Sequence, residues 1–60
     1  MKLTNAGQKL MERIGGGFAS ALAVAYVRAD LNNQAKLEAV FSEMFAQYNE
    51  MAALSGQEPQ

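Results

Sequence analysis

Large apolar residues recur every four positions through the first half of the chain. They are Leu10, Ile14, Phe18, Leu22 and Tyr26. Because residues three or four apart share one face of an α-helix, this spacing predicts a helix over about residues 5–29.

Three consecutive glycines, Gly15, Gly16 and Gly17, interrupt that helix. Each glycine inside a helix costs about 1 kcal/mol relative to alanine, so the chain either breaks into two helices here or continues with a kink. The apolar ladder keeps its phase across the glycines, which favours the continuous helix. Small residues four apart also let a second backbone approach, so we expect close helix approach at the three glycines and at Ala21.

The second half of the chain has a heptad pattern. Its apolar residues, spaced four, three, four and three apart, are Leu37, Phe41, Met44, Tyr48 and Met51. This pattern predicts a second helix over about residues 32–54. Val40 and Phe45 flank it, so the apolar arc is wide enough for two contact surfaces, one against the first helix and one against another partner.

Polar residues before the first helix offer two N-caps. Asn5 and Gln8 have the spacing of a capping box, in which each side chain bonds a free backbone N–H group. Thr4 is the competing N-cap.

A short polar turn, residues 30–33, separates the two helices. Asp and Asn bond their own local backbone, so Asp30 or Asn32 would cap the second helix. Gly56 is the expected C-terminal cap, followed by a tail over residues 56–60. A turn this short favours antiparallel neighbouring helices, so we predict one all-α domain over residues 1–60, built as a helical hairpin.

The size of the chain favours self-association. It has 60 residues and no Cys or His, and 11 of its hydrophobic residues are Ala. One core of this size supplies roughly 3–5 kcal/mol, and neither a disulfide nor a Cys or His zinc site can add to it. We therefore predict a homodimer in which two hairpins form a four-helix bundle. Its core and dimer interface are expected to comprise Leu10, Ile14, Phe18, Leu22, Leu37, Val40, Phe41, Met44, Phe45, Tyr48 and Met51.

The residues offer little catalytic chemistry. Without His or Cys, a His base and a Cys nucleophile are excluded. The glycine run lacks the Lys and the Ser or Thr of a P-loop, and Glu43 and Glu50 lie on the expected polar strip of the second helix. We therefore predict no catalytic, cofactor-binding or metal-binding residues, and a protein that is not an enzyme.

Charge is divided unevenly between the halves. Residues 1–28 hold four basic residues and Glu12, which gives +3, whereas residues 29–60 hold Lys36 and five acidic residues, which gives −4. The second helix would repel phosphate, so we expect no direct nucleic-acid binding. The alternative is a nucleic-acid-associated regulator that uses the basic first helix.

The longest uncharged run, Ile14 to Val27, has 14 residues. A membrane-spanning helix needs about 20, so we expect no membrane association and a cytoplasmic location. No apolar stretch follows Lys2 before Gly7, so no secretory signal is expected either.

About half of the chain carries a family resemblance. The residues concerned are Ala25-Tyr26, Arg28-Ala29-Asp30, Asn33, Lys36-Leu37, Val40-Phe41 and Met44-Phe45. This pattern resembles small uncharacterised helical proteins of phages, prophages and other mobile elements. The resemblance implies a protein that binds a host protein, with defence components among the candidates, and inhibits or modulates it by steric occlusion in the host cytoplasm. A structural assembly subunit is the remaining alternative.

Overall fold

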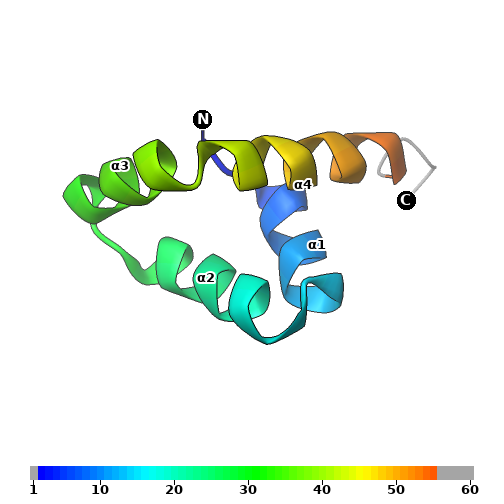
Figure 1. Ribbon diagram of the computed structural model, residues 1–60, viewed down its shortest axis with the longest axis horizontal. Helices are drawn as coiled ribbons and strands as arrows, with labels where there is room; N and C mark the ends of the chain where they lie inside the picture. The colour runs from blue at the N-terminus through cyan, green and yellow to red at the C-terminus, as the bar shows by residue number, and fades with distance from the viewer. Residues whose placement is uncertain (1, 56–60) are drawn as a thin grey trace.

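The computed structural model describes residues 2–55. Four helices make up this part of the chain, and it contains no strand: α1 (Asn5–Ile14), α2 (Gly16–Arg28), α3 (Leu31–Val40) and α4 (Ser42–Ser55). α3 and α4 follow one another along one side of the molecule, α2 runs along the other, and α1 connects the two sides (Figure 1). α1 packs against both α2 and α4. The all-α class is as predicted, but the two long helices of a hairpin are not present.

The first predicted helix breaks at the glycine run, so the prediction of a continuous helix is wrong. α1 ends where the Gly15 N–H donates to the Met11 carbonyl at 3.0 Å, and Gly16 follows with φ of 78°. Glycine reaches this left-handed conformation without steric cost, whereas other residues do not. The chain therefore changes direction here, although the apolar spacing keeps its helical phase.

The second predicted helix is bent at Phe41. The Phe41 N–H donates to the Leu37 carbonyl at 2.8 Å, and the Phe45 N–H donates to the Phe41 carbonyl at 2.9 Å. These two bonds lie at the end of α3 and at the start of α4, and φ −110° and ψ 28° at Phe41 separate the two helices. Sharp helix bends usually occur at Pro or Gly, and this joint has neither.

Aromatic contacts lie at the bend, and we attribute the bend to them. The Phe41 ring lies between Phe18 of α2 and Phe45 of α4, with ring centroids 5.8 Å and 6.4 Å away. The bend places the Phe41 ring against Phe18 of α2. In a straight helix the same ring would lie in a different position along the helix.

The N-cap of α1 is Thr4, and the expectation for Asn5 is wrong. The Thr4 hydroxyl accepts a hydrogen bond from the Gly7 N–H at 2.9 Å, and Thr4 has extended dihedral angles. Asn5 is already the first helical residue. A hydroxyl three residues before a free N–H group is the usual capping geometry.

The N-cap of α3 is Asp30, one of the two residues expected there. Its carboxylate accepts from the Asn33 N–H at 2.8 Å. Asn32 is not a cap, because it lies inside α3. The cap expected at Gly56 lies outside the described residues.

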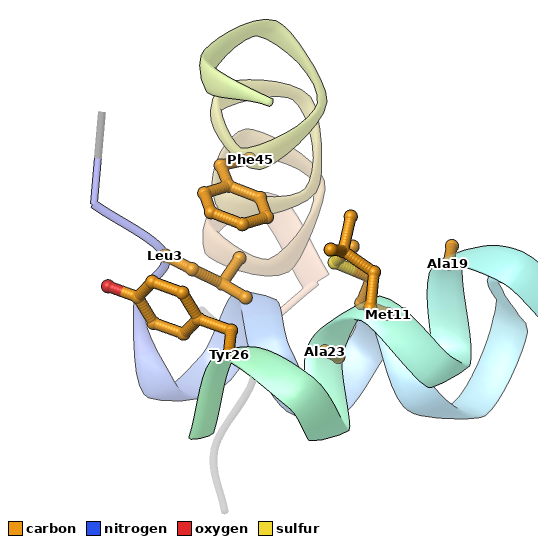
Figure 2. Close-up of a cluster of buried hydrophobic side chains, with 7 residues drawn as sticks. Leu3, Met11, Ala19, Ala23, Tyr26 and Phe45 are labelled. Atoms are coloured by element: carbon orange, nitrogen blue, oxygen red, sulfur yellow. The ribbon is translucent and has the colours of Figure 1, made fainter. Parts of the chain in front are cut away.

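The core lies where α1, α2 and α4 meet. Met11 and Phe45 are fully buried there, and Leu3 and Tyr26 pack with them (Figure 2). The Tyr26 and Phe45 rings meet edge to face with centroids 5.1 Å apart. This geometry adds about 0.5–1.5 kcal/mol to the area that the rings bury.

The residues predicted for the core and dimer interface divide into three groups. Leu10, Leu22 and Phe45 are buried. Leu37, Phe41, Met44 and Tyr48 are partly buried against the core. Ile14, Phe18, Val40 and Met51 are exposed and are not core residues of one chain. The break at Gly15 and the bend at Phe41 explain the difference, because the helices on the two sides of each interruption no longer present one common apolar face.

Candidate interaction surface

The described residues contain no enclosed site. No pocket is found over residues 2–55. No group of three or more acidic side chains in the same range lies close enough to hold a metal ion. None of the four helices is long and apolar enough to cross a membrane.

One polar network joins the N-terminal segment to α4. The Asn49 side-chain oxygen accepts from the Thr4 N–H at 2.9 Å and from the Thr4 hydroxyl at 3.0 Å. The Asn49 amide nitrogen donates to the Lys2 carbonyl at 2.7 Å. One α4 side chain thereby holds the turn that begins α1. Asn49 lies beside Glu50 of the predicted polar strip, so no structural role was expected for it. The poor fit of asparagine to a helix interior was the only signal.

Among the described glycines, Gly7 is the one that lies against a segment distant in sequence, and the sequence did not single it out. A Cβ atom built on Gly7 would collide with the Asn49 side-chain oxygen. At Gly15, an added Cβ would lie 2.6 Å from the Ala19 Cβ, where α1 turns into α2. The expected close approach at Gly16, Gly17 and Ala21 is absent within one chain: Ala21 is exposed, and nothing lies within 4 Å of a Cβ at either glycine. The change of direction at Gly16 moves α2 away from the contact that a continuous helix would make.

A second polar contact ties α3 to α2. The Tyr26 hydroxyl donates to Glu38 at 2.6 Å, and the Gln34 side chain donates to the Tyr26 carbonyl at 2.8 Å. Burial raises the pKa of the Tyr26 phenol, and the hydrogen bond to Glu38 and its negative charge raise the pKa further. α3 contains no buried residue, so these bonds and the partly buried Leu37 attach it to the rest of the chain.

Exposed apolar side chains are the most prominent surface feature. They are Ile14, Phe18, Val24, Val27, Leu31, Val40, Met51 and Leu54. Five of these eight lie between Ile14 and Leu31, on α2 and at its two ends. Leu31 and Val40 are 83% and 73% exposed, but nine residues separate them along α3, which places them on opposite sides of that helix.

We define the outer face of α2 by its exposed residues from Gly17 to Val27. They are Gly17, Phe18, Ala21, Val24, Ala25 and Val27. The opposite face of α2 carries Ala19, Leu22, Ala23 and Tyr26, which are buried in the core. α2 is therefore apolar on both sides, and no charged residue lies between Arg13 and Arg28.

Comparison with known proteins adds no relative to this description: no family model, curated protein or solved structure matches the chain. Its function is therefore argued from the surface itself.

Proposed function

We propose that the chain is a non-enzymatic protein-interaction module that acts through its exposed apolar surface. The observation that supports this proposal is the outer face of α2. Monomeric soluble proteins rarely expose a large contiguous apolar patch, and such patches commonly mark contact sites for other proteins. Here the patch follows a helix whose other side already belongs to the core.

We further propose a homodimer. Within residues 2–55, nine hydrophobic residues are buried, and three of them, Ala19, Ala23 and Ala52, have only a methyl side chain. A core of this kind is small, and association is a common source of additional stability in such chains. Because each chain has four short helices, the dimer would be a contact between two folded chains and not a bundle of two hairpins.

The partner class comes from the resemblance to proteins of phages and mobile elements. We propose that the dimer binds a host protein in the cytoplasm and inhibits or modulates it by covering part of its surface. A helical surface without a catalytic centre acts in this way by excluding the partner's own ligand. A structural subunit of a larger assembly would use the same surface with an element-encoded partner.

A capture experiment with matched variants tests the host-protein proposal. Tagged wild-type protein is expected to retain one host protein, and one of two variants, Phe18→Glu or Val40→Glu, should lose it. Arg13→Glu is a control, because it changes charge without removing an exposed apolar group. Equal retention by all four proteins would contradict binding through the apolar surface.

The nucleic-acid alternative rests on one feature of α1. Lys9 and Arg13 are both exposed and lie four residues apart, so they share one side of the helix. Lys2 precedes the helix in the chain. Binding by such a face should weaken steeply as salt increases. If DNA and RNA show no mobility shift at low salt, this alternative is excluded.

A further inference from the structure

The outer face of α2 is well shaped for another helix. Gly17, Ala21 and Ala25 are four residues apart, so they form a line of small residues along the helix. Phe18, which is 61% exposed, and Val24, which is also exposed, lie on either side of that line. Small residues let two backbones approach, and larger flanking side chains fill the grooves of the facing helix. α2 lies at the edge of the molecule, so a second helix could reach it (Figure 1).

We propose that this face is occupied by the same face of a second copy of the chain, with the two α2 helices antiparallel across a two-fold axis at Ala21. This inference rests on the self-association proposed above and specifies its surface.

The absence of charge favours a second copy over a different protein. Near a two-fold axis a residue faces its own copy, so a charged residue there would repel its equivalent, whereas away from the axis each residue faces a different one. The outer face of α2 contains no charged residue. Arg28 is seven residues from Ala21, so the two copies of Arg28 would lie about 20 Å apart, which is beyond the Debye length at physiological salt.

A dimer contact of ordinary size would involve a substantial share of the surface of this chain. A stable interface buries about 800 Å² on each partner, which is about a fifth of the 4177 Å² accessible surface of this chain. The outer face of α2 is extended at its ends by Ile14 and Leu31, which are both exposed. Arg28 and Asp30 lie between Val27 and Leu31, so the uncharged part of the face ends at Val27.

The test is sedimentation equilibrium of three proteins over a wide concentration range. Wild type is expected to approach twice the 6.5 kDa mass of one chain. Ala21→Glu places two carboxylates against each other at the axis and should weaken self-association by about 100-fold or more. Ala35→Glu is the matched control, because Ala35 is an exposed helical alanine of α3, and it should associate like wild type.

The outcomes separate this inference from the proposed function. A wild-type protein that stays monomeric at every concentration overturns both the α2 contact and the dimer. Equal association of all three proteins overturns the α2 contact but leaves the dimer standing. If Ala21→Glu remains dimeric but loses a captured host protein, α2 is the host-binding face and the inference is wrong.

A second experiment keeps the inference testable if Ala21→Glu does not fold. Because the chain has no cysteine, single-cysteine variants report directly on proximity between copies. Ala21→Cys should form an intermolecular disulfide under mild oxidation much faster than Ala35→Cys, because the axis brings its two copies together. Equal rates for the two variants would contradict the α2 contact.

Discussion

At the scale of single residues, Gly7 is a glycine at which an added methyl group would meet both α4 and the N-terminal segment. An added methyl group would collide with the Asn49 oxygen and lie 3.1 Å and 3.2 Å from Thr4 and Leu3 atoms. We expect Gly7→Ala to lower the free energy of unfolding by about 1–3 kcal/mol, because overpacking outweighs the better helix propensity of alanine. Urea denaturation measures this change. An unfolding midpoint equal to or above that of wild type would show that the Asn49 side chain moves away from the added methyl group at little cost.

Gly16 and Gly17 make a matched pair for a backbone effect. An alanine methyl meets nothing within 4 Å at either position, but only Gly16 has positive φ. Gly16→Ala should destabilise the protein by about 1–2 kcal/mol, whereas Gly17→Ala should stabilise it by up to about 1 kcal/mol. Thermal melting at one low protein concentration compares the two. If Gly16→Ala were instead the more stable variant, the chain would not reverse direction at Gly16.

The Tyr26 phenol gives the stability a dependence on high pH. Its pKa is raised above the ordinary value of 10.0 in the folded state, so the folded chain holds the phenol proton more tightly than the unfolded chain does. This contribution is therefore complete below about pH 10 and is lost as the pH rises through the higher folded value.

Tyr26→Phe tests that contribution. Its free energy of unfolding should fall less between about pH 9 and pH 11 than that of wild type, because the titrating phenol is gone. Glu38→Gln should also reduce the fall, though less, because burial is the largest cause of the raised pKa. Parallel pH profiles for wild type and Tyr26→Phe would be inconsistent with a raised pKa.

At the scale of elements, α3 is the least anchored helix. It has no buried residue and is attached to α2 by the bonds of Tyr26 with Glu38 and Gln34. Elements with few buried contacts open at lower free energy. Amide hydrogen exchange should therefore be faster in α3 than in the core-facing turns of α2. Tyr26→Phe should speed exchange in α3 more than in α1, and uniform acceleration would instead indicate a global loss of stability.

Phe41 decides how α3 and α4 meet. Its ring packs against Phe18 and Phe45, and its backbone forms the bend. Phe41→Ala should cost about 2–4 kcal/mol, somewhat less than a fully buried phenylalanine, and should straighten residues 31–55 into one helix. Urea denaturation gives the first quantity, and backbone chemical shifts at Phe41 and its neighbours give the second. A bend that persists in this variant would mean that the aromatic contacts do not cause it.

At the scale of the whole molecule, self-association and stability are linked. If the native chains pair and the unfolded chains do not, the melting temperature rises with protein concentration. Wild type should show this rise, and Ala21→Glu should not. A melting temperature that is independent of concentration in wild type would argue against a dimer, whichever surface was involved.

The sequence by itself determined the helical class, a possible break at the glycine run and the cap at Asp30. Apolar spacing of three and four residues is a local property, so it predicted helices over residues that the structure also shows as helical. Gly15–Gly17 and Asp30 act through their own backbone preferences, so a possible break and a cap could be placed there without knowing the fold. The sequence also contains no Cys or His, which excludes a His base, a Cys nucleophile and zinc sites that use these residues.

Only the tertiary structure decided which faces became the core. Met11 and Leu3 are buried and Ile14 and Phe18 are exposed, because the direction taken at Gly16 sets which residues α1 and α2 turn towards α4. The bend between α3 and α4 and the role of Asn49 have the same origin. Each depends on contacts between residues far apart in sequence, and helical periodicity contains no information about such contacts.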